Sequence, residues 1–444
     1  MLDPKYEVLR KALLGLQRFV QWSFMRVKVP SNNCRGEDGL PKTCGFGGSR
    51  RSYESGQGWK RTLKQSDQLE MVANIDPAFE RPMRTRVFLV KLLQDAIGKL
   101  SKVDFRNLAM ACICMCHITQ GKSRKDFNST KSTEEAVNKA LKEVGLDDKS
   151  QADEPNDEGQ GRHYGSDAKA KVLHMQLRLY SAAHLAELDR IVKACSGLKT
   201  NEMFDRMLAM LDESRDKIPL GVIEALYGNF SPGSGFKTVE AALSGGMAVS
   251  TSHLKTMDGD DFVAYDDLEG RAGHLNNRNF VSGTVYQAWV CDLFTFAVNL
   301  GDDTLIRAAD YCATMMEICS VNTPMANKTS MLPRTFPFLC MATMTSQPIT
   351  YLDAFQCSTL EHPVYQKTGD EAMASLHQLN KHLRTLDKQY SSRFWKETRA
   401  YVLSNKYDIE LPGRRFETID ALAEWVRDFK IAGEAKAEDS DKAA

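Results

Sequence analysis

Residues 3–30 read DPKYEVLRKALLGLQRFVQWSFMRVKVP. Asp3 is a suitable N-cap, and Pro4 suits the first turn of a helix. Apolar side chains then recur at the spacing of one helix face and stop before Pro30. The residues in this stripe are Leu9, Leu13, Leu16, Val20, Phe24 and Val27. The pattern predicts a single N-terminal helix that ends at the proline.

The same periodicity returns along most of the chain. It predicts two helices within 82–121 and further helices at about 168–195, 201–210, 280–300, 303–319, 373–386 and 419–429. Strand-like alternation is confined to the short segment 407–411, and we find no βαβ alternation and no fixed-period repeat. The sequence therefore predicts a mainly α fold: a two-lobed helical protein with an N-terminal arm and a flexible C-terminal tail.

Changes in composition suggest four segments. Residues 1–64 are expected to form the N-terminal helix followed by a basic, glycine-rich arm, which is too polar to order without a partner. Residues 65–250 form a predicted N-terminal helical lobe, with a disordered acidic insertion at about 146–167. Residues 251–432 form a predicted C-terminal helical lobe. Residues 433–444 are small and charged, and predict a flexible tail.

Length and composition indicate a globular, intracellular protein. The chain has 444 residues, of which 42% are hydrophobic and 26% charged, enough for a sizeable core. Its longest apolar run, at 108–118, is too short to span a bilayer, and the N-terminus has no signal-peptide core. Eleven cysteines without regular spacing predict reduced thiols. We expect no membrane partner.

Charge is distributed unevenly along the chain. The whole sequence is neutral, with 58 basic and 58 acidic residues, but residues 1–64 hold 13 Lys/Arg and 5 Asp/Glu. Cations beside aromatic rings suit unpaired RNA, because cations neutralise phosphates and rings stack on bases. A second basic set lies near residues 381–399. On separate lobes, the two sets would form a cleft that clamps a single strand.

The predicted RNA-binding residues are taken from both basic sets. They are Arg50, Arg51, Tyr53, Trp59, Lys60, Arg61, Arg84, Arg86, Lys388, Arg393 and Arg399. The alternative is that these are ordinary solvated helix faces with extended cationic side chains. A membrane surface or an acidic protein is a further alternative partner for such patches.

Catalytic and metal-binding motifs are not apparent. Cys112, Cys114, Cys116 and His117 cluster in an apolar helical run, where Cys112 and Cys116 share a face and Cys114 points away. This arrangement favours core packing over a zinc site. The segment 230–238 lacks the spacing of a phosphate-binding loop, and no serine nucleophile elbow is present. The sequence predicts no enzyme activity, no cofactor and no metal.

The overall build resembles the nucleocapsid and coat proteins of RNA viruses, especially negative-strand viruses. The features that carry this resemblance are the arm at 34–64, the basic segments 81–102 and 381–399, and the tail after Gly433. The resemblance implies a virion protein that encapsidates single-stranded RNA in a basic cleft and self-assembles through its terminal arms. It also implies location in the virion and the host cytoplasm.

Two other functions stay open at this point. One is a cytosolic helical enzyme whose active site is assembled from scattered residues, which would show as a pocket with convergent His and carboxylate groups. The other is a helical adaptor that binds only proteins, which would show as an exposed apolar groove without a positive cleft.

Overall fold

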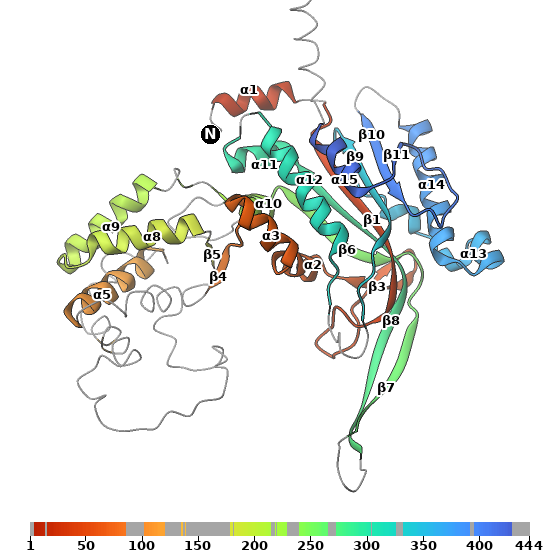
Figure 1. The fold of residues 1–444 in the computed structure, drawn as a ribbon, viewed down its shortest axis with the longest axis horizontal. Helices are drawn as coiled ribbons and strands as arrows, with labels where there is room; N and C mark the ends of the chain where they lie inside the picture. Colours follow the sequence, from red (N-terminus) through yellow and green to blue (C-terminus); the bar gives the residue numbers. More distant parts are fainter. Residues whose placement is uncertain are drawn as a thin grey trace, which may run out of the picture. The chain divides into compact units, whose positions relative to one another are not determined.

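The computed structural model describes most of the chain. It covers residues 4–13, 16–85, 102–119, 135, 138, 178–180, 182–214, 218, 220–228, 239–264, 272–302, 304–325, 332–390 and 395–428. The chain divides into two compact units (Figure 1). Unit 1 combines Met1–Ile75 with Ala241–Ala444, and unit 2 is Asp76–Glu240. The predicted acidic insertion at 146–167 and the predicted tail at 433–444 lie outside the described residues.

A nine-stranded sheet forms the centre of unit 1. The strand order is β11-β10-β9-β1-β8-β6-β3-β2, with β7 paired to β8 beside this path. All pairs are antiparallel except β10 with β11. The strands are β1 (Phe19–Ser31), β2 (Thr43–Phe46), β3 (Ser49–Glu54), β6 (Leu243–Ser250), β7 (Thr256–Ala264), β8 (Ala272–Asp292), β9 (Pro337–Thr345), β10 (Glu397–Leu403) and β11 (Arg414–Phe416). The predicted mainly α fold is therefore wrong, and the protein has an α/β fold.

The N-terminal segment shows where the helical prediction fails. Helix α1 covers only Pro4–Ala12, and Phe19–Ser31 is strand β1. This strand lies between β8 and β9, so that Trp22 faces Trp289 on one side and Ala342 on the other. Both faces of β1 are covered, and its burial therefore does not alternate along most of its length. The predicted helix at 280–300 fails likewise, because β8 continues to Asp292 before α11 begins.

Helices cover both faces of the sheet. On one face, Met25 and Tyr286 pack in a core cluster with Leu376 and Leu379 of α14. On the other face, Arg26 donates hydrogen bonds to the carbonyl oxygens of Cys319 and Ser320 in α12, at 2.7 and 3.2 Å. The helices of unit 1 are α1, α2 (Gly56–Lys64), α3 (Asp67–Ile75), α11 (Leu293–Leu300), α12 (Ile306–Val321), α13 (Pro363–Thr368), α14 (Glu371–Gln389) and α15 (Ile419–Arg427), with short 3₁₀ turns η3 (Leu352–Phe355) and η4 (Thr359–Glu361).

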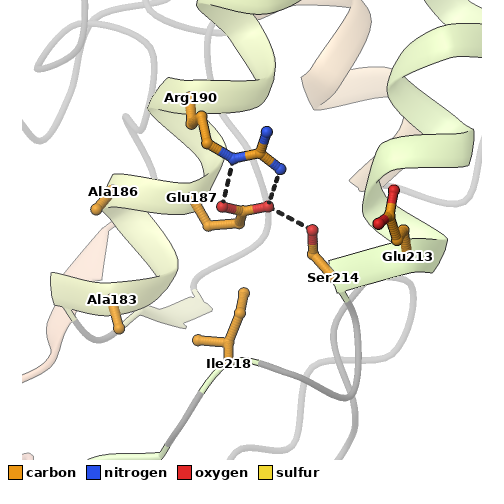
Figure 2. A pocket seen from close by; sticks show the side chains of 7 residues that line it. All are labelled: Ala183, Ala186, Glu187, Arg190, Glu213, Ser214 and Ile218. Atoms are coloured by element: carbon orange, nitrogen blue, oxygen red, sulfur yellow. Dashed lines mark hydrogen bonds and ion pairs between the residues drawn. The ribbon is translucent and has the colours of Figure 1, made fainter.

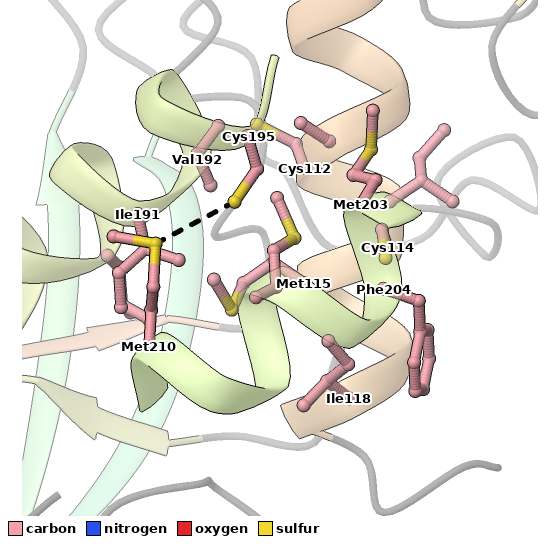
Figure 3. Close-up of a cluster of buried hydrophobic side chains, with 14 of the residues drawn as sticks. Cys112, Cys114, Met115, Ile118, Ile191, Val192, Cys195, Met203, Phe204 and Met210 are labelled. Carbon is pink, nitrogen blue, oxygen red and sulfur yellow. Dashed lines mark hydrogen bonds between the residues drawn. The ribbon is translucent and has the colours of Figure 1, made fainter. Parts of the chain in front are cut away.

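Unit 2 is mainly helical in its described part. It contains η1 (Pro77–Phe79), β4 (Met83–Thr85), α5 (Lys102–Thr119), β5 (Arg178–Tyr180), α8 (Ala182–Cys195), α9 (Thr200–Ser214) and α10 (Val222–Tyr227). Helices α5, α8 and α9 share one sulfur-rich core (Figure 3). Cys112 and Cys114 are buried in this core, as the core-packing interpretation predicts. Within the described residues, no group of three or more His, Cys, Asp or Glu side chains is placed to hold a metal ion.

Strands β7 and β8 form a long hairpin that projects from the rest of unit 1 (Figure 1). They pair from Thr256 opposite Val281 to Ala264 opposite Ala272. Near its base, Gly283 adopts a φ of +129°, where a Cβ atom would approach the Glu371 carboxylate to 3.1 Å. Among the described helices, none combines the length and apolar character needed to cross a membrane.

Candidate nucleic-acid interface

The segment predicted to be a mobile arm is part of the sheet. Within 34–64, β2 and β3 form a hairpin and α2 follows directly. The hairpin turns at Gly47 and Gly48, which have φ values of +59° and +72°. The prediction of an arm that lacks its own structure is therefore wrong. Its glycines serve tight turns and close approaches, which local composition does not distinguish from disorder.

Helix α2 is held by a buried polar network beneath it. Ser55 caps the helix by accepting a hydrogen bond from the Gly58 amide (3.3 Å). The indole of Trp59 donates to Glu54 at 3.1 Å, and Glu54 also pairs with Lys28 at 2.9 Å. The Arg26 guanidinium lies 4.8 Å from the centre of the Trp59 ring. These contacts fix α2 against β1, which determines where its remaining side chains are displayed.

The cations of α2 and of the loop before β2 lie at the surface. Arg61 and Arg35 are exposed, while Lys60 and Lys64 are half-buried. Burial lowers the pKa of Lys60 below its usual value. The loop lies against the start of α2, since a Cβ atom added to Gly58 would be 3.1 Å from the sulfur of Cys34. We call these four residues, Arg35, Lys60, Arg61 and Lys64, the α2 surface. They suit phosphate groups.

Several predicted binding residues are internal instead. Arg51 is fully buried and donates to the carbonyl oxygens of Thr251, Phe355 and Gln356, at 2.6, 3.2 and 3.2 Å. Burial lowers its pKa. Trp59 is 1% exposed, so its ring is not presented to a base. Arg399 is also buried and pairs with Asp387 at 2.8 Å.

The remaining predicted residues are more scattered. Arg50 is exposed in β3 and donates to Thr43 at 2.9 Å, and Tyr53 is half-buried in the same strand. Lys388 is exposed near the end of α14. Arg84 belongs to β4 in unit 2. Arg86 and Arg393 lie outside the described residues. Arg35 and Lys64 were not among the predicted residues, although they flank the same glycine-rich stretch.

The two basic sets do not form one cleft. Trp59 of α2 lies against Arg26, whereas α14 packs against Met25. Adjacent residues of a strand point to opposite faces of its sheet. The α2 surface and α14 therefore lie on opposite sides of the sheet in unit 1, and the predicted clamp between two lobes is wrong.

A surface hollow of about 460 Å³ occurs in unit 2 (Figure 2). Two of its charged groups are engaged with each other: Arg190 donates twice to Glu187, at 2.8 and 2.6 Å, and the Ser214 hydroxyl donates to the same carboxylate. The hydrogen bonds from Arg190 hold the pKa of Glu187 below its usual value. The rest of the lining includes Ala183, Ala186 and Ile218. This arrangement links α8 to the end of α9 and does not resemble an acid–base pair poised for catalysis.

Comparison with known proteins identifies relatives of the whole chain. The family model of CT1975-like proteins matches residues 20–425. A chain of a solved structure described as "CRISPR RNA-guided surveillance complex, pre-nicking" is similar over 92% of this chain and 100% of its own, with a TM-score of 0.64 and 17% identity. A chain of another "CRISPR RNA-guided surveillance complex" is similar over 92% and 99%, with a TM-score of 0.56 and 18% identity. No match is found among curated protein sequences.

These matches correct the functional predictions made from sequence. They point to a CRISPR-associated protein, so the resemblance to viral nucleocapsid proteins is wrong, as are the predicted encapsidation of viral RNA and the location in a virion. The helical enzyme and the helical adaptor fail as well, since both assumed a helical fold. Because the family model spans most of the sequence, the chain belongs to the CT1975-like protein family.

Proposed function

We propose that this chain is an RNA-binding, non-catalytic subunit of a CRISPR RNA-guided surveillance complex. It binds a single-stranded guide RNA and associates with copies of itself and with other subunits. The observation that carries the proposal is the shared fold: 92% of this chain matches a chain of such a complex with a TM-score of 0.64. Membership of the CT1975-like family supports the same role.

The α2 surface supplies the chemistry that RNA binding needs. Three of its four cations, Lys60, Arg61 and Lys64, sit on a helix that Trp59 and Leu63 anchor in the core, so their backbone is held in position before any ligand binds. Preorganised cations lose little conformational entropy when phosphates bind. A surface of cations binds the phosphates of the RNA backbone and needs no deep aromatic pocket. It therefore shows little preference for the RNA sequence.

The test is a fluorescence anisotropy titration of the full chain with a labelled single-stranded RNA at about 50 and 500 mM salt. We expect affinity to fall steeply with salt, because bound phosphates release counterions. The variant Lys60→Gln/Arg61→Gln should bind at least about tenfold more weakly at low salt. Its salt slope should be smaller by about 1.4, from about 0.7 per lost contact.

The matched control removes two exposed cations from elsewhere in unit 1, Lys11→Gln and Arg307→Gln. It should bind RNA as the unaltered chain does, because neither cation belongs to the α2 surface. The two variants lose the same charge, so a difference between them reports the position of the cations and not the net charge. Assembly is tested by co-expression with a guide RNA and isolation by size exclusion, where a raised 260/280 absorbance ratio reports retained RNA. Failure of the unaltered chain to bind RNA at low salt, together with no retained RNA, would overturn the proposal.

A further inference from the structure

The outer face of α14 carries a straight row of basic side chains. His377, Lys381, Arg384 and Lys388 are all exposed and are separated by four, three and four residues. This spacing places them on one face of a helix. The opposite face is fixed in the core by Leu376, Leu379 and Leu383. We call these four residues the α14 row.

The length of the α14 row suits a nucleic-acid backbone. Its eleven-residue span from His377 to Lys388 corresponds to about 16 Å at 1.5 Å per residue. One strand of a duplex carries a phosphate about every 3.4 Å along its axis. The α14 row can therefore contact several successive phosphates of one strand.

Two acidic residues near the α14 row are paired with side chains outside the row. Asp387 pairs with the buried Arg399 at 2.8 Å, and Asp353 pairs with His382 at 3.3 Å. Glu410 meets Arg384 through its main-chain carbonyl oxygen, at 3.4 Å. Within the part of the chain that the structure describes, the cationic groups of Lys381, Arg384 and Lys388 form no ion pair. All three side chains are exposed, and Arg384 also donates a hydrogen bond to the Asn380 side chain at 3.0 Å.

The N-terminal end of the α14 row creates a positive electrostatic potential, which is seen in its effect on His362. The rings of His377 and His362 stack with centroids 6.1 Å apart. Burial lowers the pKa of His362, and the nearby His377 and Lys381 lower it further. A histidine whose protonation is opposed by its neighbours indicates a local positive potential, which favours an anionic ligand.

We propose that the α14 row is a second nucleic-acid site, which holds the phosphate backbone of a strand other than the guide RNA. The site lies on the opposite side of the sheet from the α2 surface, so a strand that follows one surface does not run directly onto the other. An acidic protein fits less well, because a protein interface needs buried apolar anchors. Among the described residues, Tyr390 presents an exposed aromatic ring beside the C-terminal end of the α14 row. Such a ring can stack on an unpaired base.

This inference rests on the proposed function in one respect: it takes the guide RNA to bind at another surface of the chain. The test variant is Lys381→Gln/Arg384→Gln/Lys388→Gln, measured in the full chain with and without guide RNA. The probes are a labelled 30-base-pair DNA duplex, a single-stranded DNA and a single-stranded RNA, each titrated at several salt concentrations. The control variant Lys11→Gln/Arg307→Gln/Lys396→Gln removes the same charge at other exposed positions.

We expect the α14 variant to bind the preferred probe at least about tenfold more weakly at 0.1 M salt. Its salt slope should decrease by about 0.9 for each lost contact with the duplex and by about 0.7 with a single strand. Guide RNA retention should stay unchanged, as should binding by the control. The Lys381→Arg/Lys388→Arg variant should retain binding, since a guanidinium also contacts phosphate. The strongest probe identifies the strand as DNA or RNA.

Three results would overturn the inference. These are unchanged probe binding in the α14 variant, an equal loss in the control variant, or loss of guide RNA and assembly with probe binding intact. The last result would assign α14 to contacts between subunits.

Circular dichroism checks that the variants are folded. If the triple variant is unstable, the single variants Lys381→Gln and Lys388→Gln should each show a smaller loss of probe binding. Because probe binding is measured without guide RNA as well, failure of the guide-RNA proposal is seen separately.

Discussion

Glu54 and Lys28 form a buried ion pair, with 2.9 Å between the Lys28 amine and the carboxylate and side chains 3% and 7% exposed. The same carboxylate accepts hydrogen bonds from Trp59 and from the side-chain amide of Asn33, both at 3.1 Å. One acidic side chain thus joins β1, the loop that follows it, and α2. This group therefore helps to hold the α2 surface in position, together with the Ser55 cap and the buried Trp59 and Leu63 side chains.

Glu54→Gln should destabilise unit 1 by about 3–5 kcal/mol, because Lys28 would be left as an uncompensated buried charge. The measurement is urea unfolding monitored by tryptophan fluorescence, which reports on unit 1 because all five tryptophans lie there. The control is Glu37→Gln in the exposed loop before β2, which should change stability by less than about 0.5 kcal/mol. Equal effects in the two variants would contradict the structural role of Glu54.

Arg51 and Arg50 are neighbours with opposite environments. Arg51→Lys should lower unfolding free energy by about 3 kcal/mol, because an ammonium group cannot reach the carbonyl oxygens that the buried guanidinium holds together. Arg50→Lys should be nearly neutral, since its side chain is exposed. Thermal unfolding of both variants tests this. A stable Arg51→Lys protein with weakened RNA binding would instead place Arg51 at the ligand.

Gly47 and Gly48 occupy the same turn but differ in the space around them. A Cβ atom on Gly47 would lie 1.8 Å from the carbonyl oxygen of Gln356. Around a Cβ atom on Gly48, no atom of the described residues lies within 4 Å, apart from its two neighbours in the chain. Gly48→Ala should cost about 1 kcal/mol from its positive φ alone. Gly47→Ala should cost at least about 3 kcal/mol, because backbone must move. Chemical denaturation should rank the two variants in this order, and the reverse ranking would refute the packing of the turn against Gln356.

Tyr286 gives unit 1 a specific response to alkali. Its phenol is buried and contacts the Ser23 hydroxyl at 3.0 Å, and burial raises its pKa to about 12. In the unfolded chain the phenol ionises near pH 10, so its contribution to stability is full below pH 10 and is lost as pH rises toward 12. The expected loss is about 1.4 kcal/mol per pH unit in that range.

Tyr286→Phe tests this dependence through urea midpoints at pH 8, 10 and 11. The variant should be less stable at pH 8 by about 1 kcal/mol, from the lost hydrogen bond. Between pH 10 and 11 its stability should fall less steeply than that of the unaltered chain, so the two curves converge. Parallel curves across this range would show that Tyr286 does not titrate as its burial requires.

The sequence predicts the surface helices of this protein better than its sheet. Helices α9, α12, α14 and α15 each have one apolar and one polar face, and periodicity finds them near their observed positions. Strand β1 has both faces covered, so its apolar residues do not alternate. Val20, Phe24 and Val27 then fit a helical period equally well.

The candidate site shows a related limit. Charge and composition direct attention to 34–64, but they do not separate exposed Arg50 from buried Arg51. The difference arises from the carbonyl groups of Thr251, Phe355 and Gln356, which are 200 or more residues away in sequence. Such partners are not visible in local sequence, and the same is true of the glycine turn that packs against Gln356.

The central position of β1 has a consequence for biosynthesis. Its neighbouring strands, β8 and β9, begin at Ala272 and Pro337. Strand β1 therefore leaves the ribosome first and cannot pair until these later strands have been synthesised. At about 5–20 residues per second, the delay before β8 emerges is roughly 10–50 s. During that interval an apolar strand with two open edges is exposed, while unit 2 is completed first. Production of this protein should accordingly depend on chaperones that bind nascent chains.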